Sequence, residues 1–593
     1  MNNFFIPPAF VFIIAAAFLP LFSGKVRSVY LLLIPVVGFA NLINIPHGNF
    51  WAYSFLDYGL HLIRVDKVSL LFGYAFHLIT FVTLIYALNF KRNMEYVAGL
   101  IYAGGALGAV FAGDLITLFI FWELMTISST FLVWARGTES SIGSGYRYML
   151  VHLLGGLVLL IGIILHGQET GSMAFNHIGL GTVGSYFIFF GFGVNCAWPF
   201  LHSWLTDAYP EASIAGTVFL SAFTTKTAVY ALARGYAGTD ALIWIGVGMA
   251  AFPIFYAVIE NDLRRVLAYS LINQVGFMVV GIGIGTELAV NGALAHVFTD
   301  IMFKALLFMG MGAVLYRTGK IKATELGGLY KYMPYTTIFT IVGAASISAF
   351  PLFSAFASKS MVMSAAVHES LYFVWLVLLF ASAGVFHHAG IKIPFFAFFG
   401  HDSGLKPKEA PMNMLIAMGI LAFLNIFIGT FPSFLYNLLP YPVEYKPYTA
   451  DHVIFQLQIL LFSALAFTLL LRAGIYPAEI RSTNIDSDWT YRRGYRAFLW
   501  LIDKPVLGFM NYMKKLFFES IPGKLKHFSK NPMAIIMLTF SNSESRKHIT
   551  DCIINEEDAY LESMNIHWSI GLSVILIIAF LVIYLLVFMI SLL

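Results

Sequence analysis

Long apolar runs recur along the chain from residue 7 almost to Leu593. A helix needs about 20 predominantly apolar residues to cross the hydrocarbon core of a bilayer. These runs do not alternate polar and apolar residues as membrane-barrel strands do, whereas helices satisfy their backbone hydrogen bonds internally. The pattern predicts an all-α, polytopic membrane protein with about sixteen spans, at residues 7–23, 28–45, 67–89, 97–113, 115–134, 148–166, 181–205, 213–234, 242–259, 266–285, 290–316, 335–366, 372–398, 412–435, 452–472 and 568–592.

Composition agrees with a membrane protein and excludes several other classes. Of the 593 residues, 59% are hydrophobic and 11% are charged, against about 25% charged in soluble domains. The net charge is +4 with the basic residues dispersed in loops, which argues against a nucleic-acid partner. Cys196 and Cys552 lie far apart without a CxxC motif, so we expect no redox cofactor and no metal site. The first run lacks the preceding basic residues of a signal peptide, and we expect it to remain as a span.

The loop charges predict an orientation. If the N-terminus lies outside, most loop lysines and arginines fall on one side, and the other side receives only Arg64, Lys67, Arg234 and Lys446. Basic loops face the cytoplasm. We therefore expect a multi-pass protein of a bacterial plasma or inner membrane with an external N-terminus.

Residues 476–567 interrupt the apolar pattern before the last span. Apolar residues from Trp500 to Phe517 recur near helical spacing with Arg and Lys between them. This pattern predicts a cytoplasmic amphipathic helix at the membrane interface or against a partner. A short soluble cap over the loops is the alternative.

Titratable residues occur at membrane depth. Glu123, in FWELMTISSTF, sits about eight residues into its span and thus near the bilayer midplane. A charge there costs about 2.5–3.5 kcal/mol, so such residues face the bundle interior and commonly mark ion or proton paths. The further candidates lie in neighbouring spans, and His296, Asp300 and Lys304 share one helix face because they recur every four residues; the full set is Glu123, Lys226, His296, Asp300, Lys304 and Lys359.

Less demanding interpretations exist for each residue. Glu123 and Lys226 could form a purely structural ion pair, although a whole set of buried charges is an expensive way to hold helices together. His152 is more typical of a satisfied core histidine, and His202 lies near a span end where it could bond a loop. Lysine suits proton relay because burial lowers its pKa and a nearby carboxylate raises it.

Two prolines suggest an internal duplication. Pro199 and Pro351 interrupt spans five apart, and broken helices in corresponding positions indicate repeats around an ion path. Residues 97–234 would mirror residues 242–398, and an odd number of spans requires the second copy to be inverted. The predicted division is 1–96 N-terminal helices, 97–234 first repeat, 242–398 second repeat, 412–472 additional helices, 476–567 amphipathic segment and 568–592 last span.

Seven motifs together resemble one family over roughly residues 60–435, namely RVDKVSLLF, GDLITLFIFWELM, PFLHSWLTDAYPEAS, KTAVYALAR, ENDLRRVLAYSLINQVGFM, HVFTDIMFKALLF and ISAFPLFSAFASKS. The family is shared by Mrp-type cation/proton antiporters and the antiporter-like proton-pumping subunits of respiratory complex I and membrane-bound hydrogenases. Within it the chain most resembles the D-type Mrp subunit, and its tail resembles the lateral helix of the largest complex I antiporter-like subunit.

The resemblance implies two inverted five-helix repeats and a proton path. It carries Glu123 as the glutamate of the fifth span, Lys226 as the lysine of the eighth, His296 and Lys304 as the eleventh-span pair, and Lys359 as the exit lysine of the twelfth. Asp300 stands where some relatives have a second histidine. Asn195 stands where many relatives have a lysine that pairs with the glutamate, so either Lys226 partners Glu123 or the first half-channel works differently.

The expected function is proton translocation in a multisubunit monovalent cation (Na⁺)/proton antiporter, with other hydrophobic subunits as partners. The alternative is a proton-pumping subunit of a complex I-like NADH:quinone oxidoreductase or membrane-bound hydrogenase, without a redox site of its own. A third possibility is a scaffold whose Asn195 channel does not conduct.

Overall fold

The computed structural model describes residues 5–55, 58–90, 92–474, 484–530, 539–540 and 580. Within them, 11 helices are long and apolar enough to cross a membrane, and each coincides with a predicted span. Four other predicted spans consist of shorter helices. The predicted span at 568–592 lies outside the described residues apart from residue 580, so the total of sixteen stays a prediction.

The N-terminal part contains three long helices and a hairpin; its elements are α1 (Pro8–Phe18), η1 (Leu19–Leu21), α2 (Gly24–Ile43), β1 (Gly48–Phe55), β2 (Tyr58–Val65) and α3 (Lys67–Ala87). The antiparallel hairpin was not predicted, because a search for long apolar runs passes over short mixed strands. Arg64 of β2 donates to the carbonyl of Phe175 at 2.8 Å, which ties the hairpin to the membrane body.

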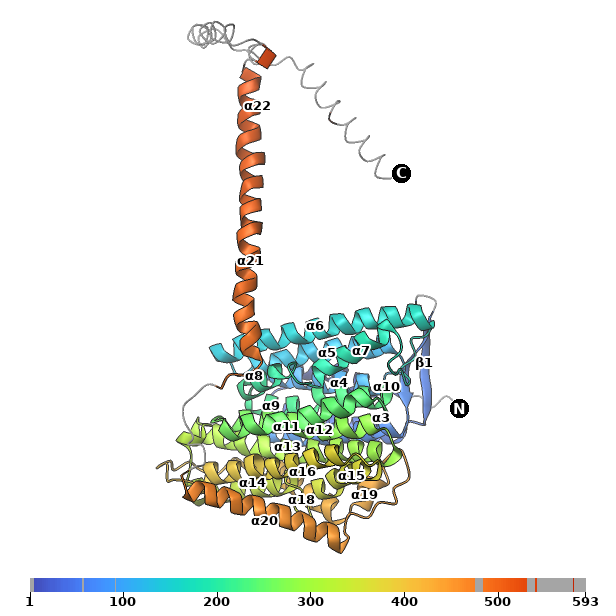
Figure 1. The fold of residues 1–593 in the computed structure, drawn as a ribbon, viewed down its shortest axis with the longest axis vertical. Helices are drawn as coiled ribbons and strands as arrows, with labels where there is room; N and C mark the ends of the chain where they lie inside the picture. Colours follow the sequence, from blue (N-terminus) through green and yellow to red (C-terminus); the bar gives the residue numbers. More distant parts are fainter. Residues whose placement is uncertain are drawn as a thin grey trace. The chain divides into compact units, whose positions relative to one another are not determined.

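The membrane body continues through two series of helices (Figure 1). The first series is α4 (Asn93–Phe111), α5 (Leu115–Trp134), α6 (Glu139–Thr170), α7 (Val183–Asn195), α8 (Ser203–Glu211), α9 (Ile214–Ala222) and α10 (Thr224–Gly235). The second is α11 (Asp240–Ile259), α12 (Leu263–Ile284), α13 (Glu287–Thr318), η2 (Ala323–Glu325), η3 (Leu329–Lys331), α14 (Pro334–Ile347), α15 (Ser354–His368), α16 (Tyr372–Val385), η4 (Phe386–Ile391), α17 (Lys392–Pro394) and η5 (Phe395–Phe399). Then follow α18 (Met412–Thr430), α19 (Ser433–Tyr436) and α20 (Ala450–Arg472).

The two series share landmarks at a constant spacing. α6 and α13 each have 32 residues. Each follows a threonine N-cap and ends at a left-handed glycine, Gly171 or Gly319, with φ 69° in both. The N-caps of α5 and α12, Asp114 and Asp262, each form an isolated β-bridge to a later loop. These matching features support the duplicated architecture, while the boundaries 97–234 and 242–398 remain predictions.

Both predicted proline breaks are confirmed. α7 and α8 are separated at Ala197-Trp-Pro-Phe200, and α14 and α15 at Ala349-Phe-Pro-Leu352. All four terminal residues of these motifs have positive φ, at 61°, 68°, 55° and 73° in chain order. Each such non-glycine conformation costs about 1–3 kcal/mol and concentrates at functional sites. The backbone strain therefore marks the same place in each repeat.

α13 forms the centre of the body. Its most apolar stretch is 100% buried, whereas that of α20 is 17% buried, and α13 lies between the helices of the first repeat and α14 to α20 (Figure 1). Charged side chains on α13 are therefore enclosed by protein rather than facing lipid.

The chain divides into two compact units, Met1–Trp489 and Thr490–Leu593. The predicted amphipathic helix is present as α21 (Asp488–Lys514), the π-helical η6 (Lys515–Ser520) and α22 (Ile521–Lys530); its place at the membrane interface stays a prediction. Within the first unit, Tyr269 Oη donates to Asp486 at 2.6 Å, and His202 Nε2 lies 3.1 Å from the same carboxylate. Burial raises the pKa of Asp486, but the hydrogen bond and charge of His202 outweigh burial and hold the pKa below its ordinary value.

Candidate functional site: a buried polar row across the two repeats

An ion pair joins the two repeats at the centre of the body. Lys226 Nζ lies 2.6 Å from Asp300 Oδ2, and neither side chain is exposed. Lys226 also donates to the carbonyl of Ser221 at 2.9 Å. That carbonyl is free because the helix breaks at Phe223, between α9 and α10. The interpretation that Lys226 partners Glu123 is therefore wrong, since the ammonium is paired with the second repeat.

Glu123 of α5 lies against α6 instead. A Cβ built on Gly156 would stand only 1.8 Å from Glu123 Oε1, so the carboxylate fills the space left by the missing side chain. This oxygen is buried and has no hydrogen-bond partner among the described residues. A buried carboxylate oxygen without a partner is costly, which indicates a hydrated or transiently protonated site.

His152 lies one helical turn before Gly156 and is bonded to Asn195. His152 Nδ1 is 2.8 Å from Asn195 Oδ1, and an amide oxygen only accepts, so Nδ1 carries the hydrogen. His152 Nε2 is buried without a partner in the part of the chain that the structure describes. Tyr148 and Trp204 hold the ring, each with its centroid 4.3 Å away. Asn195 thus orients a histidine whose free nitrogen can accept a proton.

Hydroxyl groups lead from His152 toward Lys226. Tyr148 Oη is 2.9 Å from Ser129 Oγ and 3.5 Å from Thr224 Oγ1. Thr224 begins α10 and also bonds Tyr102. Because Lys226 is two residues further along the same helix, this chain of hydroxyls connects the first repeat's titratable groups with the central ion pair.

A second polar group lies between α12, α13 and α15. His296 Nε2 donates to Gln274 Oε1 at 3.2 Å, because the amide oxygen only accepts. His296 Nδ1 is 3.0 Å from Ser358 Oγ. One turn beyond Asp300 on the face that also bears His296, Lys304 is fully buried with its Nζ 3.5 Å from the carbonyl of Leu267. The sequence prediction that these α13 side chains share one face is confirmed.

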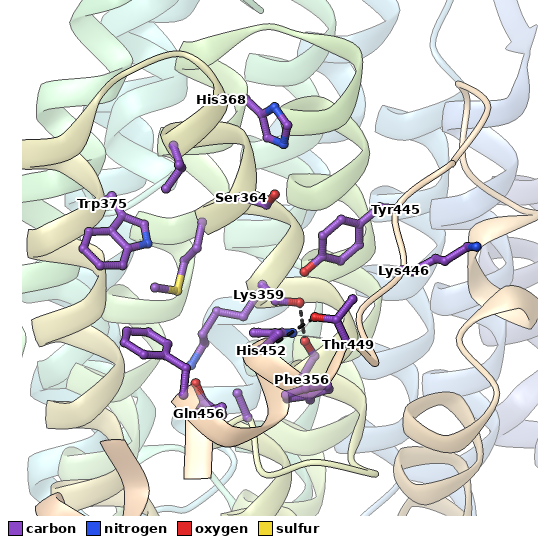
Figure 2. Close-up of a pocket in the computed structure, with 15 residues that line it drawn as sticks. Phe356, Lys359, Ser364, His368, Trp375, Tyr445, Lys446, Thr449, His452 and Gln456 are labelled. Atoms are coloured by element: carbon purple, nitrogen blue, oxygen red, sulfur yellow. Dashed lines mark hydrogen bonds between the residues drawn. The ribbon is translucent and has the colours of Figure 1, made fainter. Parts of the chain in front are cut away.

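Lys359 lies at the second helix break and borders a pocket. Its Nζ donates to the carbonyl of Ile347 at 3.0 Å, the last residue of α14. Figure 2 shows Lys359 of α15 and His452 of α20 facing the same pocket, which has a volume of ≈ 340 Å³. The lining includes Lys446 and His368 but no carboxylate. A Na⁺ ion would meet lysine charge there without a compensating acid, whereas water could receive a proton.

The six predicted site residues therefore form a row with one displaced member. Lys226 and Asp300 form the ion pair, His296 and Lys304 lie on the same face of α13 as Asp300, and Lys359 lies at the adjoining break. Glu123 stands apart, beside His152 and Asn195. Sequence reasoning gave His152 little weight because a single histidine on an apolar face carries no spacing signal; its 148-residue offset from Asp300, equal to that between Gly171 and Gly319, could have raised it.

We expect Gly156→Ala to slow proton transfer without unfolding the protein. The added methyl collides with the end of a flexible side chain, so Glu123 moves while the helices stay packed. Proton flux in vesicles and thermal unfolding would be measured together. Gly143→Ala is the control, since its Cβ would meet only Arg147 Nη1 at 3.4 Å in the same helix; equal flux in the two variants would contradict the assigned position of Glu123.

Comparisons with known proteins agree with this geometry. Residues 112–385 match the family model described as NADH:quinone oxidoreductase/Mrp antiporter, transmembrane. Hydrogenase-4 component B of Escherichia coli K12 is 28% identical, over 63% of this chain. A Na(+)/H(+) antiporter subunit of Alkalihalophilus pseudofirmus is 27% identical, over 75% of this chain. The alignment spans 63% of the length of each of these two relatives.

Two solved assemblies contain chains with the same fold. One is the Mrp complex from Dietzia sp. DQ12-45-1b, with TM-score 0.62, 20% identity and coverage of 77% of this chain and 95% of that chain. The other is the membrane-bound sulfane sulfur reductase, an archaeal respiratory membrane complex, with TM-score 0.66, 24% identity and coverage of 77% and 98%. The helical antiporter-like fold predicted from the sequence is thereby confirmed.

Proposed function

Because residues 112–385 belong to the NADH:quinone oxidoreductase/Mrp antiporter transmembrane family, we propose that this chain is a proton-translocating membrane subunit of a multisubunit monovalent cation (Na⁺)/proton antiporter. The observation that carries the proposal is the fully buried Lys226–Asp300 pair joining the repeats. A buried pair is a poor stabiliser of a fold. Its position at the junction of two polar groups instead suits transfer of charge between them.

The pair acts as an electrostatic switch. While Lys226 is held by Asp300, its ammonium keeps its proton. A proton that reaches Asp300 from Lys226 leaves a neutral amine and a neutral acid, which removes the local charge and lets the α13 groups reprotonate. His152 and Glu123 supply protons on one side, and Lys304 and Lys359 receive them on the other. No bound cofactor takes part in these transfers.

The setting follows from the same evidence. The chain lies in a bacterial plasma membrane with its N-terminus outside, as the loop charges favour. Its partners are further hydrophobic subunits, since the two structural neighbours come from multisubunit membrane complexes. The carboxylate-free pocket at Lys359 favours proton release there, so the Na⁺ path lies elsewhere in the assembly. Assignment to the D-type subunit is the finer form of this proposal.

A second candidate is a proton-pumping subunit of a redox-driven complex. The similarity to hydrogenase-4 component B and to a chain of the sulfane sulfur reductase complex favours it. Purification of the native assembly separates the two. Small hydrophobic antiporter subunits support the antiporter, and iron–sulfur or flavin subunits support the redox-driven pump.

We expect Glu123→Gln to reduce proton flux of the native complex in everted vesicles by about 100-fold, in the range for loss of a proton-transfer group. Gln keeps the size of the side chain but cannot carry the proton. Glu139→Gln is the matched control, because Glu139 is exposed at the start of α6. Full flux in well-assembled Glu123→Gln complexes would overturn the proton-path assignment and favour a scaffold.

A further inference from the structure

One fully buried histidine lies outside the row described above. His388 has no exposed surface, and neither ring nitrogen has a hydrogen-bond partner among the described residues by distance and angle. The carbonyl of Gly384, one turn earlier, is close enough to serve one nitrogen, which leaves at least the other unpaired. An unpaired imidazole nitrogen in a protein interior is costly, so it points to a bound water or a proton.

The backbone around His388 is irregular. His388 belongs to η4, a π-helical stretch of residues Phe386–Ile391, and such stretches are frequent at functional sites. Gly390 in η4 approaches Ser348 so closely that a Cβ would stand 2.3 Å from its Oγ. Ser348 follows Ile347, whose carbonyl binds Lys359. The π-helical stretch therefore packs directly on the second helix break.

Charged groups lie on both sides of His388. Lys304, Lys392 and the neighbouring His387 are close enough for their charges to act on its ring. Lys392 is buried and donates to the carbonyls of Val258 and Glu260, each at 2.7 Å, at the C-terminal end of α11. A cation at a helix C-terminus is favourable, so Lys392 is a fixed charge that marks the Glu260 end of the body.

This end is opposite to the Lys359 pocket. α12 begins beside Glu260 at Leu263 and runs to the other end of the body, where α13 starts. There, Asn291 donates to the carbonyl of Tyr441 at 3.0 Å, and the following loop lines the pocket with Tyr445 and Lys446. His388 and Lys359 thus lead from the same α13 lysine toward opposite ends of the helices.

We propose that His388 is a further proton-transfer residue, forming a second branch that connects Lys304 with the Glu260 end of the body. The inference rests on the proposed function. In the step, the Lys304 ammonium loses a proton through an intervening water and the imidazole becomes imidazolium. The imidazolium then releases a proton from its other nitrogen toward the Glu260 end, and the reverse sequence reloads Lys304. The fixed charge of Lys392 opposes the imidazolium, so the proton does not stay.

The first test is His388→Gln in the native complex, where the second repeat would lose one of its two branches. We expect flux to fall at least about tenfold, the lower range for a lost proton carrier, with assembly unchanged. His387→Gln is the matched control, because the adjacent ring packs on Phe467 of α20 at 5.2 Å. Equal flux in the two variants would overturn the proposal, whereas a wild-type complex without flux would instead overturn the proposed function.

The second test does not depend on transport. In complexes with Cys196 and Cys552 replaced by alanine, His388→Cys would be treated with a small cationic thiol reagent from either face of the vesicle. We expect modification at least about tenfold faster from the Glu260 face, as the branch requires. Ala389→Cys, also without exposed surface, should stay unmodified. An unreactive His388→Cys, or faster reaction from the Tyr441 face, would overturn the proposal even if His388→Gln fails to assemble.

Discussion

Lys226→Ala is expected to abolish proton flux and to destabilise the protein more than any other single change in the polar row. The substitution leaves the Asp300 carboxylate buried, at 0% exposure, without its cation. Removal of one partner from a buried pair costs about 3–5 kcal/mol. Thermal unfolding of the purified complex and flux in vesicles would measure the two effects.

The double variant Lys226→Met with Asp300→Leu separates stability from transport. Replacing a buried pair by apolar side chains of similar volume is often neutral or stabilising, so thermal stability should return to the wild-type level. Flux should stay absent, because neither side chain can carry a proton. Flux in the double variant would show that the pair is a structural link only. Asp300→Leu alone should resemble Lys226→Ala in both measurements.

His152→Gln is expected to lower flux by about 100-fold. Gln can still donate to Asn195 and nearly preserves the packing between Tyr148 and Trp204, but it cannot accept and pass a proton. His177→Gln, in an exposed loop position, is the control. If His152 were only a satisfied core residue, the two variants would give equal flux.

Adding Asn195→Lys to His152→Gln tests whether this histidine replaces the lysine found in relatives. We expect the lysine to restore part of the flux. The alkaline limit of activity should move to higher pH, because the reference pKa of lysine, about 10.4, exceeds that of histidine, about 6.5. Flux would be measured across pH in both backgrounds. A double variant without flux would indicate that position 195 lies outside the path.

The spans and the two proline breaks could be predicted, and the break at Phe223 could not. Proline lacks the N–H that a helix needs, so Pro199 and Pro351 announce their own effect. Phe223 has no such signature, and its conformation of φ −110° and ψ −63° comes from packing. That break exposes the Ser221 carbonyl to Lys226, so a feature invisible in the sequence positions a residue that was easily found.

The sequence by itself determined that this chain is a helical membrane protein with acids, histidines and lysines at bilayer depth, because length, hydropathy and charge act locally in each span. The tertiary structure alone decided which groups meet. Lys226 binds Asp300 from a helix some seventy residues away, Asn195 orients His152, and Glu123 occupies the space beside Gly156. Partner choice depends on how helices from separate repeats pack and rotate against one another, and no spacing within a single span records it.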